Sequence, residues 1–197
     1  MKGKLILVLG GTRSGKSDFA EQQAVRLEKR VIYIATAAVK DGEMAKRVQK
    51  HRARRPASWE TVEEEKNVID VIRKGQKGDV FLLDCATLWV TNLLLDQCPP
   101  FQDVPASWED VPVSPKKEAW ILEQAHLLGD SVNNGADLII VASETGLGLV
   151  PENPLARVFR DLAGKVNQIL ASKADEVYFI IAGLPLKIKP CAGLKME

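Results

Sequence analysis

A glycine-rich segment near the start of the chain, which reads GGTRSGKS, limits most strongly what this sequence can fold into. It matches the pattern G-x-x-x-x-G-K-[ST], follows an apolar run at residues 5–9 and precedes a helical pattern at 17–29. The glycines let successive backbone N–H groups face an anion, and the helix adds the positive end of its dipole. The predicted phosphate-binding loop consists of Gly10, Gly11, Thr12, Arg13, Ser14, Gly15, Lys16 and Ser17.

Two side chains of this loop and two acids further along the chain are candidates for chemistry. Lys16 can reach the β- and γ-phosphates of a nucleotide, and the Ser17 hydroxyl can bind Mg²⁺. Asp84 ends the apolar run VFLL, where a carboxylate can orient a hydrated Mg²⁺. Glu144 follows a second apolar run and could act as a base toward a substrate hydroxyl or assist the metal. A turn or capping role is the alternative for both acids.

Short apolar runs rich in β-branched residues alternate with helical patterns along the chain. They lack polar alternation, as expected for a parallel sheet covered on both faces. Alternating strands and helices predict an α/β fold with right-handed crossovers, in one domain over residues 1–197. The expected strands are 5–9, 31–35, 80–83, 138–142 and 177–182, and the expected helices are 17–29, 43–54, 66–74, 87–95, 116–133 and 154–174. Residues 97–115 hold five of the ten prolines and are expected to form a surface excursion.

Composition narrows the possible partners and the compartment. The net charge of +1 gives no general reason to expect nucleic acid or a membrane surface as partner. The first apolar run is too short for a signal peptide or a membrane span, so no stable membrane insertion is expected. The three cysteines form no C-x-x-C pair, which favours neither a zinc site nor a disulfide framework. These features are typical of a cytoplasmic protein.

A strongly cationic stretch at residues 46–55 contains His51, one of only two histidines. A neutral imidazole, with a reference pKa of about 6.5, is a good nucleophile near neutral pH. Flanking cations favour the neutral form and attract a polyphosphate, which suits attack on a nucleotide phosphorus. The charge pattern alone favours the plainer interpretation, a solvated basic helix face. The other histidine, His126, lies in an apolar helical pattern and is expected to have a packing or surface role.

Several separate blocks of the chain, in order, match one known enzyme family. The blocks are residues 9–17, 33–37, 41–44, 51–56 with Trp59, Thr61 and Glu63, then 82–85, 89–93 and 144–153, followed by Arg157, Phe159, Arg160, Asp161, Gly164, Asn167 and Gln168. Through these blocks the chain resembles the adenosylcobinamide kinase / adenosylcobinamide-phosphate guanylyltransferase family. The resemblance implies a RecA-like P-loop NTPase fold and two reactions that use ATP or GTP. Adenosylcobinamide is phosphorylated first, and its phosphate then receives GMP from GTP.

The resemblance also implies roles for particular residues. A family histidine that carries GMP covalently maps onto His51. The resemblance also implies that the protein is a homotrimer, with its site near the subunit boundaries. The implied nucleotide contacts are the phosphate loop and Thr36, Ala37, Ala38, Arg52, Ala53, Arg54, Arg55, Glu63 and Asp84.

Two departures and two alternatives accompany this resemblance. Some relatives have histidine at the position of Lys50, and some have glutamate at that of Asp84.

One alternative is a P-loop kinase of another small metabolite, which would keep Lys16, Ser17 and Asp84 without a covalent nucleotide. The other is a RecA-like ATPase module that binds nucleic acid through residues 46–55, with salt-sensitive affinity.

Overall fold

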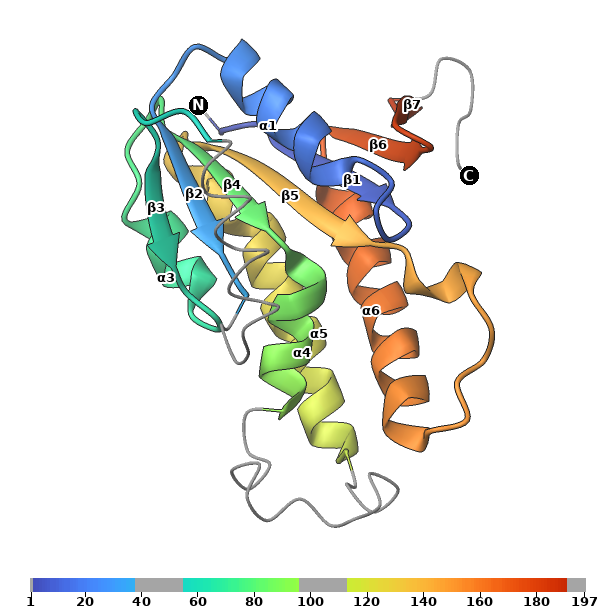
Figure 1. Ribbon diagram of the computed structural model, residues 1–197. Helices are drawn as coiled ribbons and strands as arrows, with labels where there is room; N and C mark the ends of the chain where they lie inside the picture. Colours follow the sequence, from blue (N-terminus) through green and yellow to red (C-terminus); the bar gives the residue numbers. More distant parts are fainter. Residues whose placement is uncertain (1, 38–54, 96–112, 191–197) are drawn as a thin grey trace.

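The structure is a computed structural model that describes residues 2–37, 55–95 and 113–190. Its strands form one seven-stranded sheet in the order β3-β2-β4-β5-β1-β6-β7 (Figure 1). All neighbouring strands are parallel except β6 and β7, which are antiparallel. The strands are β1 (Leu5–Gly10), β2 (Val31–Ala35), β3 (Glu60–Glu63), β4 (Val80–Asp84), β5 (Asp137–Ser143), β6 (Glu176–Ile181) and β7 (Leu184–Lys189).

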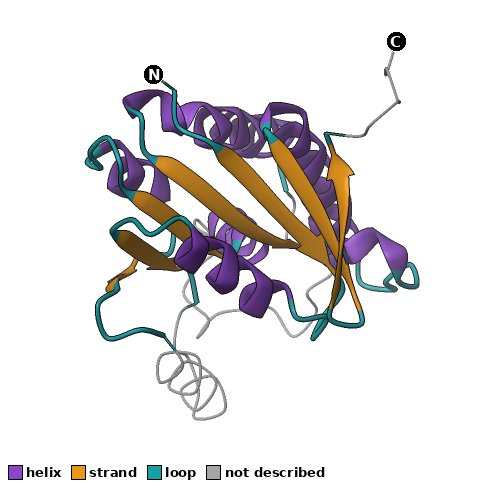
Figure 2. Ribbon diagram, turned by 90° about the horizontal axis from the view of Figure 1, so that it is seen from above, coloured by secondary structure: helices purple, strands orange, loops and turns teal. Residues whose placement is uncertain are grey.

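Helices cover both faces of this sheet (Figure 2). The helix α1 packs on one face, while α3, α4, α5 and α6 contribute to the core on the other. Among the described residues, no helix is both long and apolar enough to cross a bilayer. The helices are α1 (Lys16–Arg26), α3 (Val68–Arg73), α4 (Ala86–Leu95), α5 (Pro115–Asp130) and α6 (Pro154–Lys173), with 3₁₀ turns η3 (Ser131–Asn134) and η4 (Thr145–Leu147).

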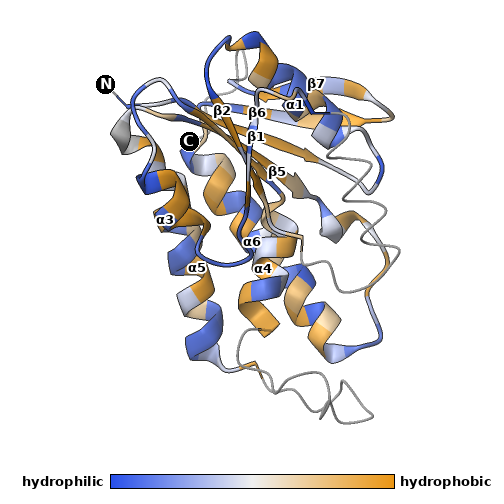
Figure 3. Cartoon of the chain, turned by 60° about the vertical axis from the view of Figure 1, so that its left-hand side comes forward, coloured by the Kyte–Doolittle hydropathy of each residue, from blue (hydrophilic) through white to orange (hydrophobic). Residues whose placement is uncertain are grey.

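The central strands are apolar throughout because both of their faces are covered. All six residues of β1 are buried, with Leu5 and Leu7 in the core beneath α6 and Ile6 and Val8 in the core beneath α1. In Figure 3 the central strands are coloured almost wholly hydrophobic, whereas the helices also carry hydrophilic residues. This is the pattern expected of a doubly covered parallel sheet.

Side-chain caps fix where the two long helices begin. The Ser114 side chain accepts a hydrogen bond from the backbone N–H of Lys117, and Pro115 occupies the first turn of α5. At α6 the Asn153 side chain accepts from Ala156 N in the same way. Such caps satisfy backbone donors that have no partner within the helix.

The predicted α/β class and its mainly parallel sheet are confirmed, and all five predicted strands are present. The sequence did not predict β3 and β7, which are the two edge strands. Both lack a buried apolar run, since β3 is exposed at its ends and β7 is exposed along most of its length. The predicted helix at 43–54 and residues 97–112 of the predicted excursion lie outside the described residues. Pro115 belongs to α5 rather than to an excursion.

Candidate active site

The candidate site lies where the carboxyl ends of five parallel strands meet. In the sheet register, Ala35 at the end of β2 pairs with Glu63 of β3 on one side and with Asp84 of β4 on the other. On the neighbouring strands, Gly10 at the end of β1 pairs with Ser143 at the end of β5. Ligands of open α/β sheets bind beyond this edge. The predicted phosphate loop and the acids Glu63 and Asp84 therefore converge on one edge of the sheet.

The phosphate loop has the tight backbone that its glycines predict. Gly10, Arg13 and Gly15 have positive φ values of 154°, 58° and 96°. A Cβ on Gly10 would lie 2.6 Å from a backbone oxygen of β6, so a larger residue does not fit there. The N–H of Gly183, in the turn between β6 and β7, donates to Ser14 O at 2.9 Å. This hairpin therefore supports the loop from one side.

Lys16 is buried at the first position of α1, and its Nζ donates to Gly11 O at 2.6 Å. Burial lowers the pKa of the Lys16 ammonium, against the opposing effect of Cys85 and Asp84. A cation in this position can neutralise phosphate charge at the start of a helix, where the dipole also favours an anion. Ser17 follows as the second residue of α1 and is half-buried.

Asp84 ends β4, and a buried tyrosine holds one of its oxygens. The Tyr33 hydroxyl donates to Asp84 Oδ2 at 2.7 Å. Burial, and then the neighbouring carboxylate, raise the pKa of Tyr33 far above its usual range, so the phenol keeps its proton and donates. The guanidinium carbon of Arg55 lies 3.3 Å from the centre of the Tyr33 ring. Arg55, Tyr33 and Asp84 therefore form a continuous row of contacts.

Thr36 ties the end of β2 to the turn after β4. Its side chain is fully buried, and its Oγ1 accepts from Cys85 N at 2.8 Å and donates to Cys85 O at 2.9 Å. The Asn92 side chain of α4 also donates to Thr36 O at 2.9 Å. The hydroxyl of Thr36, a predicted nucleotide contact, is thus engaged within the protein. Ala37 follows it and is half-buried.

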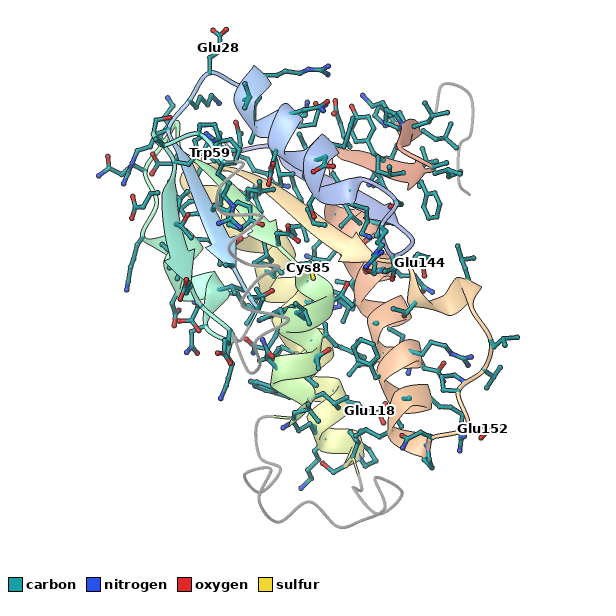
Figure 4. The ribbon with its side chains drawn as sticks, viewed as in Figure 1. Glu28, Trp59, Cys85, Glu118, Glu144 and Glu152 are labelled. Carbon is teal, nitrogen blue, oxygen red and sulfur yellow. The ribbon has the colours of Figure 1, made fainter. Side chains whose placement is uncertain are left out.

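Glu144 follows β5 and lies beside the phosphate loop (Figure 4). Its backbone N–H donates to Gly10 O at 3.1 Å. The Asn167 side chain of α6 donates to Glu144 Oε2 at 3.3 Å and to Ser143 O at 3.1 Å. The N–H of Ser143 in turn donates to Thr87 Oγ1 of α4 at 2.6 Å. The end of β5 is therefore anchored to β1, α4 and α6.

Sequence reasoning assigned no role to Thr87 or Asn167 in this arrangement. Asn167 offered one signal, because it is an amide within the buried stripe of α6 next to Val166. A buried amide needs hydrogen-bond partners, which suggests that such a residue holds something in place. Thr87 offered no comparable signal.

Three buried side-chain atoms lack a hydrogen-bond partner in the part of the chain that the structure describes. They are Ser14 Oγ in the phosphate loop, Thr145 Oγ1 directly after Glu144, and Arg55 Nε. A buried polar atom without a partner costs free energy, and such atoms need an explanation in a folded protein. All three atoms belong to residues that form the candidate site, as expected if a polar ligand completes it.

The remaining predicted site residues differ in where they lie. Glu63 is exposed at the carboxyl end of β3. No group of three His, Cys, Asp or Glu side chains suited to a metal exists among the described residues. Mg²⁺ is commonly bound by one or two carboxylates together with waters and substrate phosphates, so Ser17 and Asp84 fit this ion. The predicted contacts Ala38, His51, Arg52, Ala53 and Arg54 lie outside the described residues.

Two solved structures have a similar fold. The ATP synthase subunit NeqB from Nanoarcheaum equitans is 14% identical, covering 90% of this chain and 47% of that chain, with a TM-score of 0.50. A Pyrococcus horikoshii OT3 protein is 8% identical, covering 94% and 86% of the two chains, with a TM-score of 0.53. At these identities the similarity supports the RecA-like P-loop fold alone.

Sequence comparison is more specific. The family model described as cobinamide kinase / cobinamide phosphate guanyltransferase matches residues 6–188. The bifunctional adenosylcobalamin biosynthesis protein CobP of Pseudomonas aeruginosa is 42% identical over 184 residues, which is 93% of this chain and 96% of the relative. The protein CobU of Escherichia coli, with the same description, is 40% identical over 186 residues, or 94% and 99% of the two chains. This chain therefore belongs to the cobinamide kinase / cobinamide phosphate guanyltransferase family.

Proposed function

We propose that this protein phosphorylates adenosylcobinamide with ATP or GTP and then transfers GMP from GTP to the new phosphate. The products of the second step are adenosylcobinamide-GDP and pyrophosphate. Family membership supports the pair of reactions. The observation that carries the proposal is the convergence of the phosphate loop, Lys16, Asp84 and Glu144 at one edge of the sheet.

In the phosphorylation step, the nucleotide phosphates occupy the loop at residues 10–17. The hydroxyl oxygen on the aminopropanol group of adenosylcobinamide attacks the γ-phosphorus, and the bond from this phosphorus to the β–γ bridging oxygen breaks. Glu144 accepts the hydroxyl proton, and the nucleoside diphosphate leaves. Lys16 stabilises charge on the transferred group. The position of Glu144, hydrogen-bonded through its backbone to Gly10, supports this assignment.

Ser17 and Asp84 would hold Mg²⁺ in this site, and the ion would neutralise charge on the phosphate oxygens. The hydrogen bond from Tyr33 fixes one oxygen of Asp84 and so limits how the carboxylate can turn. Glu63, on the neighbouring strand, and the backbone of residues 36–38 would contact the rest of the nucleotide.

In the GMP transfer, a ring nitrogen of His51 attacks the α-phosphorus of GTP. The bond from this phosphorus to the α–β bridging oxygen breaks, and pyrophosphate leaves. A phosphate oxygen of adenosylcobinamide phosphate then attacks the same phosphorus, and the phosphorus–nitrogen bond breaks. The arginines between residues 52 and 55 stabilise the charge. Arg55, four residues after His51, contacts the ring of Tyr33, whose hydroxyl donates to Asp84, and this supports the proposal that His51 acts at this site.

The test is to incubate the protein with Mg²⁺ and GTP labelled at the α-phosphate. Wild-type protein should retain acid-labile, alkali-stable label, and His51→Ala should not. His126→Ala is the matched control, because His126 is the only other histidine and is exposed on α5. Absence of label from folded wild-type protein that binds GTP would contradict the covalent mechanism and favour a P-loop kinase of another metabolite.

The same proposal includes a homotrimer of single-domain subunits in the cytoplasm. The resemblance to the family supports the trimer, and the cysteine pattern supports a reducing compartment. Light scattering coupled to gel filtration should give three times the mass of one chain. A mass of one or two chains would contradict the trimer and would leave the two reactions untouched.

A further inference from the structure

A buried asparagine on α6 makes two hydrogen bonds to the end of β5. Only 6% of the surface of Asn167 is exposed. Its Nδ2 lies 3.1 Å from Ser143 O and 3.3 Å from Glu144 Oε2. One amide group therefore contacts both the backbone that leads into Glu144 and the Glu144 carboxylate.

The position of this asparagine on its helix makes a purely packing role unfavourable. The buried residues of α6 are otherwise apolar, and Asn167 lies directly beside Val166 in that stripe. Placing an amide there costs free energy unless its donors are used, whereas an apolar residue would carry no such cost. An amide N–H₂ has two donors, which match one backbone carbonyl and one carboxylate oxygen.

The backbone around Glu144 is held on two further sides. Glu144 N donates to Gly10 O in the phosphate loop, and Ser143 N donates to Thr87 Oγ1. These bonds place the Glu144 backbone but leave its side-chain torsions free. Within residues 2–37, 55–95 and 113–190, the hydrogen bond from Asn167 to Oε2 is the contact that limits the carboxylate itself.

We propose that Asn167 is a positioning residue for phosphoryl transfer. It holds one oxygen of Glu144 so that the other is available to accept the proton of the substrate hydroxyl. This inference rests on the proposed function, in which Glu144 is the base of the phosphorylation step. GMP transfer to the enzyme uses His51 and needs no proton acceptor at Glu144, so Asn167 affects the first reaction only.

The test is a double-mutant cycle with Asn167→Ala and Glu144→Gln, which measures whether the two side chains act as a unit. The rate of adenosylcobinamide phosphorylation is measured at saturating substrates, together with the KM for ATP. Loss of the base should lower kcat by about 10²- to 10⁴-fold. Loss of positioning should lower kcat by about 10²-fold, with little change in KM. In the Glu144→Gln background, Asn167→Ala should lower kcat by less than about 2-fold, since effects of residues that act as a unit are not additive.

A structural role would give different results. If Asn167→Ala lowers kcat by the same factor in both backgrounds, or lowers GMP labelling as much as phosphorylation, the proposal is wrong. Unchanged phosphorylation by Asn167→Ala also overturns it. Far-UV circular dichroism of the variants reports folding, and absence of GMP labelling from wild-type protein would mark failure of the proposed function rather than of this inference.

Two further variants keep the test decisive. Asn167→Asp preserves size but loses both donors and places a second carboxylate against Glu144, so it replaces Asn167→Ala if that variant does not fold. It should lower kcat at least as much as Asn167→Ala does. Lys165→Ala, at an exposed position on the same helix, is the matched control and should leave kcat unchanged.

Discussion

At the scale of single residues, Tyr33 shows how a buried side chain can control a functional one. Its hydroxyl donates a hydrogen bond to Asp84 Oδ2, and the Arg55 guanidinium packs over its ring. Tyr33→Phe keeps the ring and removes only the donor. We expect the Mg²⁺ concentration needed for half-maximal activity to rise by about 10-fold or more, because contacts to metal-binding carboxylates tune metal affinity. The free energy of unfolding should fall by about 1–3 kcal/mol, since a carboxylate loses a buried partner.

A matched control for this prediction is present in β6. The Tyr178 hydroxyl donates to Glu176 Oε2 at 2.9 Å, away from the candidate site. Tyr178→Phe should therefore leave the Mg²⁺ dependence unchanged. Equal Mg²⁺ dependence of Tyr33→Phe and wild-type protein would show that Tyr33 does not position Asp84.

At the scale of secondary-structure elements, Glu176 joins β6 to β7 and to the residue before β1. Burial opposes its ionisation, but hydrogen bonds from Lys4, Lys187 and Tyr178 outweigh burial and lower the pKa of Glu176 from 4.5 to about 2. A carboxylate with a lowered pKa stabilises the fold above pH 4.5, and this contribution is lost as the pH falls toward 2.

The variant Glu176→Gln tests whether the Glu176 carboxylate stabilises the fold in this way. At pH 7 the variant should lose about 1 kcal/mol, as expected for partly exposed ion pairs. That loss corresponds to about 2–4 °C in Tm for a chain of this size. The difference in Tm should shrink between pH 4.5 and 2. Glu123→Gln, at an exposed position on α5, is the control. A Tm difference that does not change with pH would contradict the assigned ion pairs.

At the scale of the whole molecule, nucleotide binding should stabilise the fold. A ligand at 100 times its Kd adds about 2.7 kcal/mol. For this chain length the gain corresponds to about 5–10 °C in Tm. Lys16→Met should abolish the shift caused by GTP and Mg²⁺, because the buried cation that meets the phosphates is lost. The Tm of the free variant should not fall, since burial disfavours the Lys16 ammonium and lowers its pKa.

Differential scanning fluorimetry measures both Tm values. Lys77→Met is the matched control, since Lys77 is exposed in the loop before β4, at the opposite edge of the sheet. It should keep the full shift. A full GTP-dependent shift in Lys16→Met would show that the nucleotide phosphates bind elsewhere.

The sequence by itself determined the features that depend on neighbouring residues. The phosphate loop was predictable because its glycines, Lys16 and the flanking apolar run follow one another along the chain. The buried strands and the parallel class of the sheet were predictable because a strand that is covered on both faces is a continuous apolar run in the sequence. Asp84 and Glu144 were predictable as residues that end such runs. The edge strands β3 and β7 were not, since an edge strand has less to bury.

Only the tertiary structure decided the partners of these residues. Asn167 and Glu144 are 23 positions apart, and Tyr33 and Asp84 are 51 apart. Their contacts depend on β2 pairing with β4, and on α6 packing beneath β5 and β1. The same pairing engages the hydroxyl of Thr36, which the resemblance had implied as a nucleotide contact. Local sequence encodes the periodicity of an element, but strand order and register set the distances between elements, and hydrogen bonds depend on those distances.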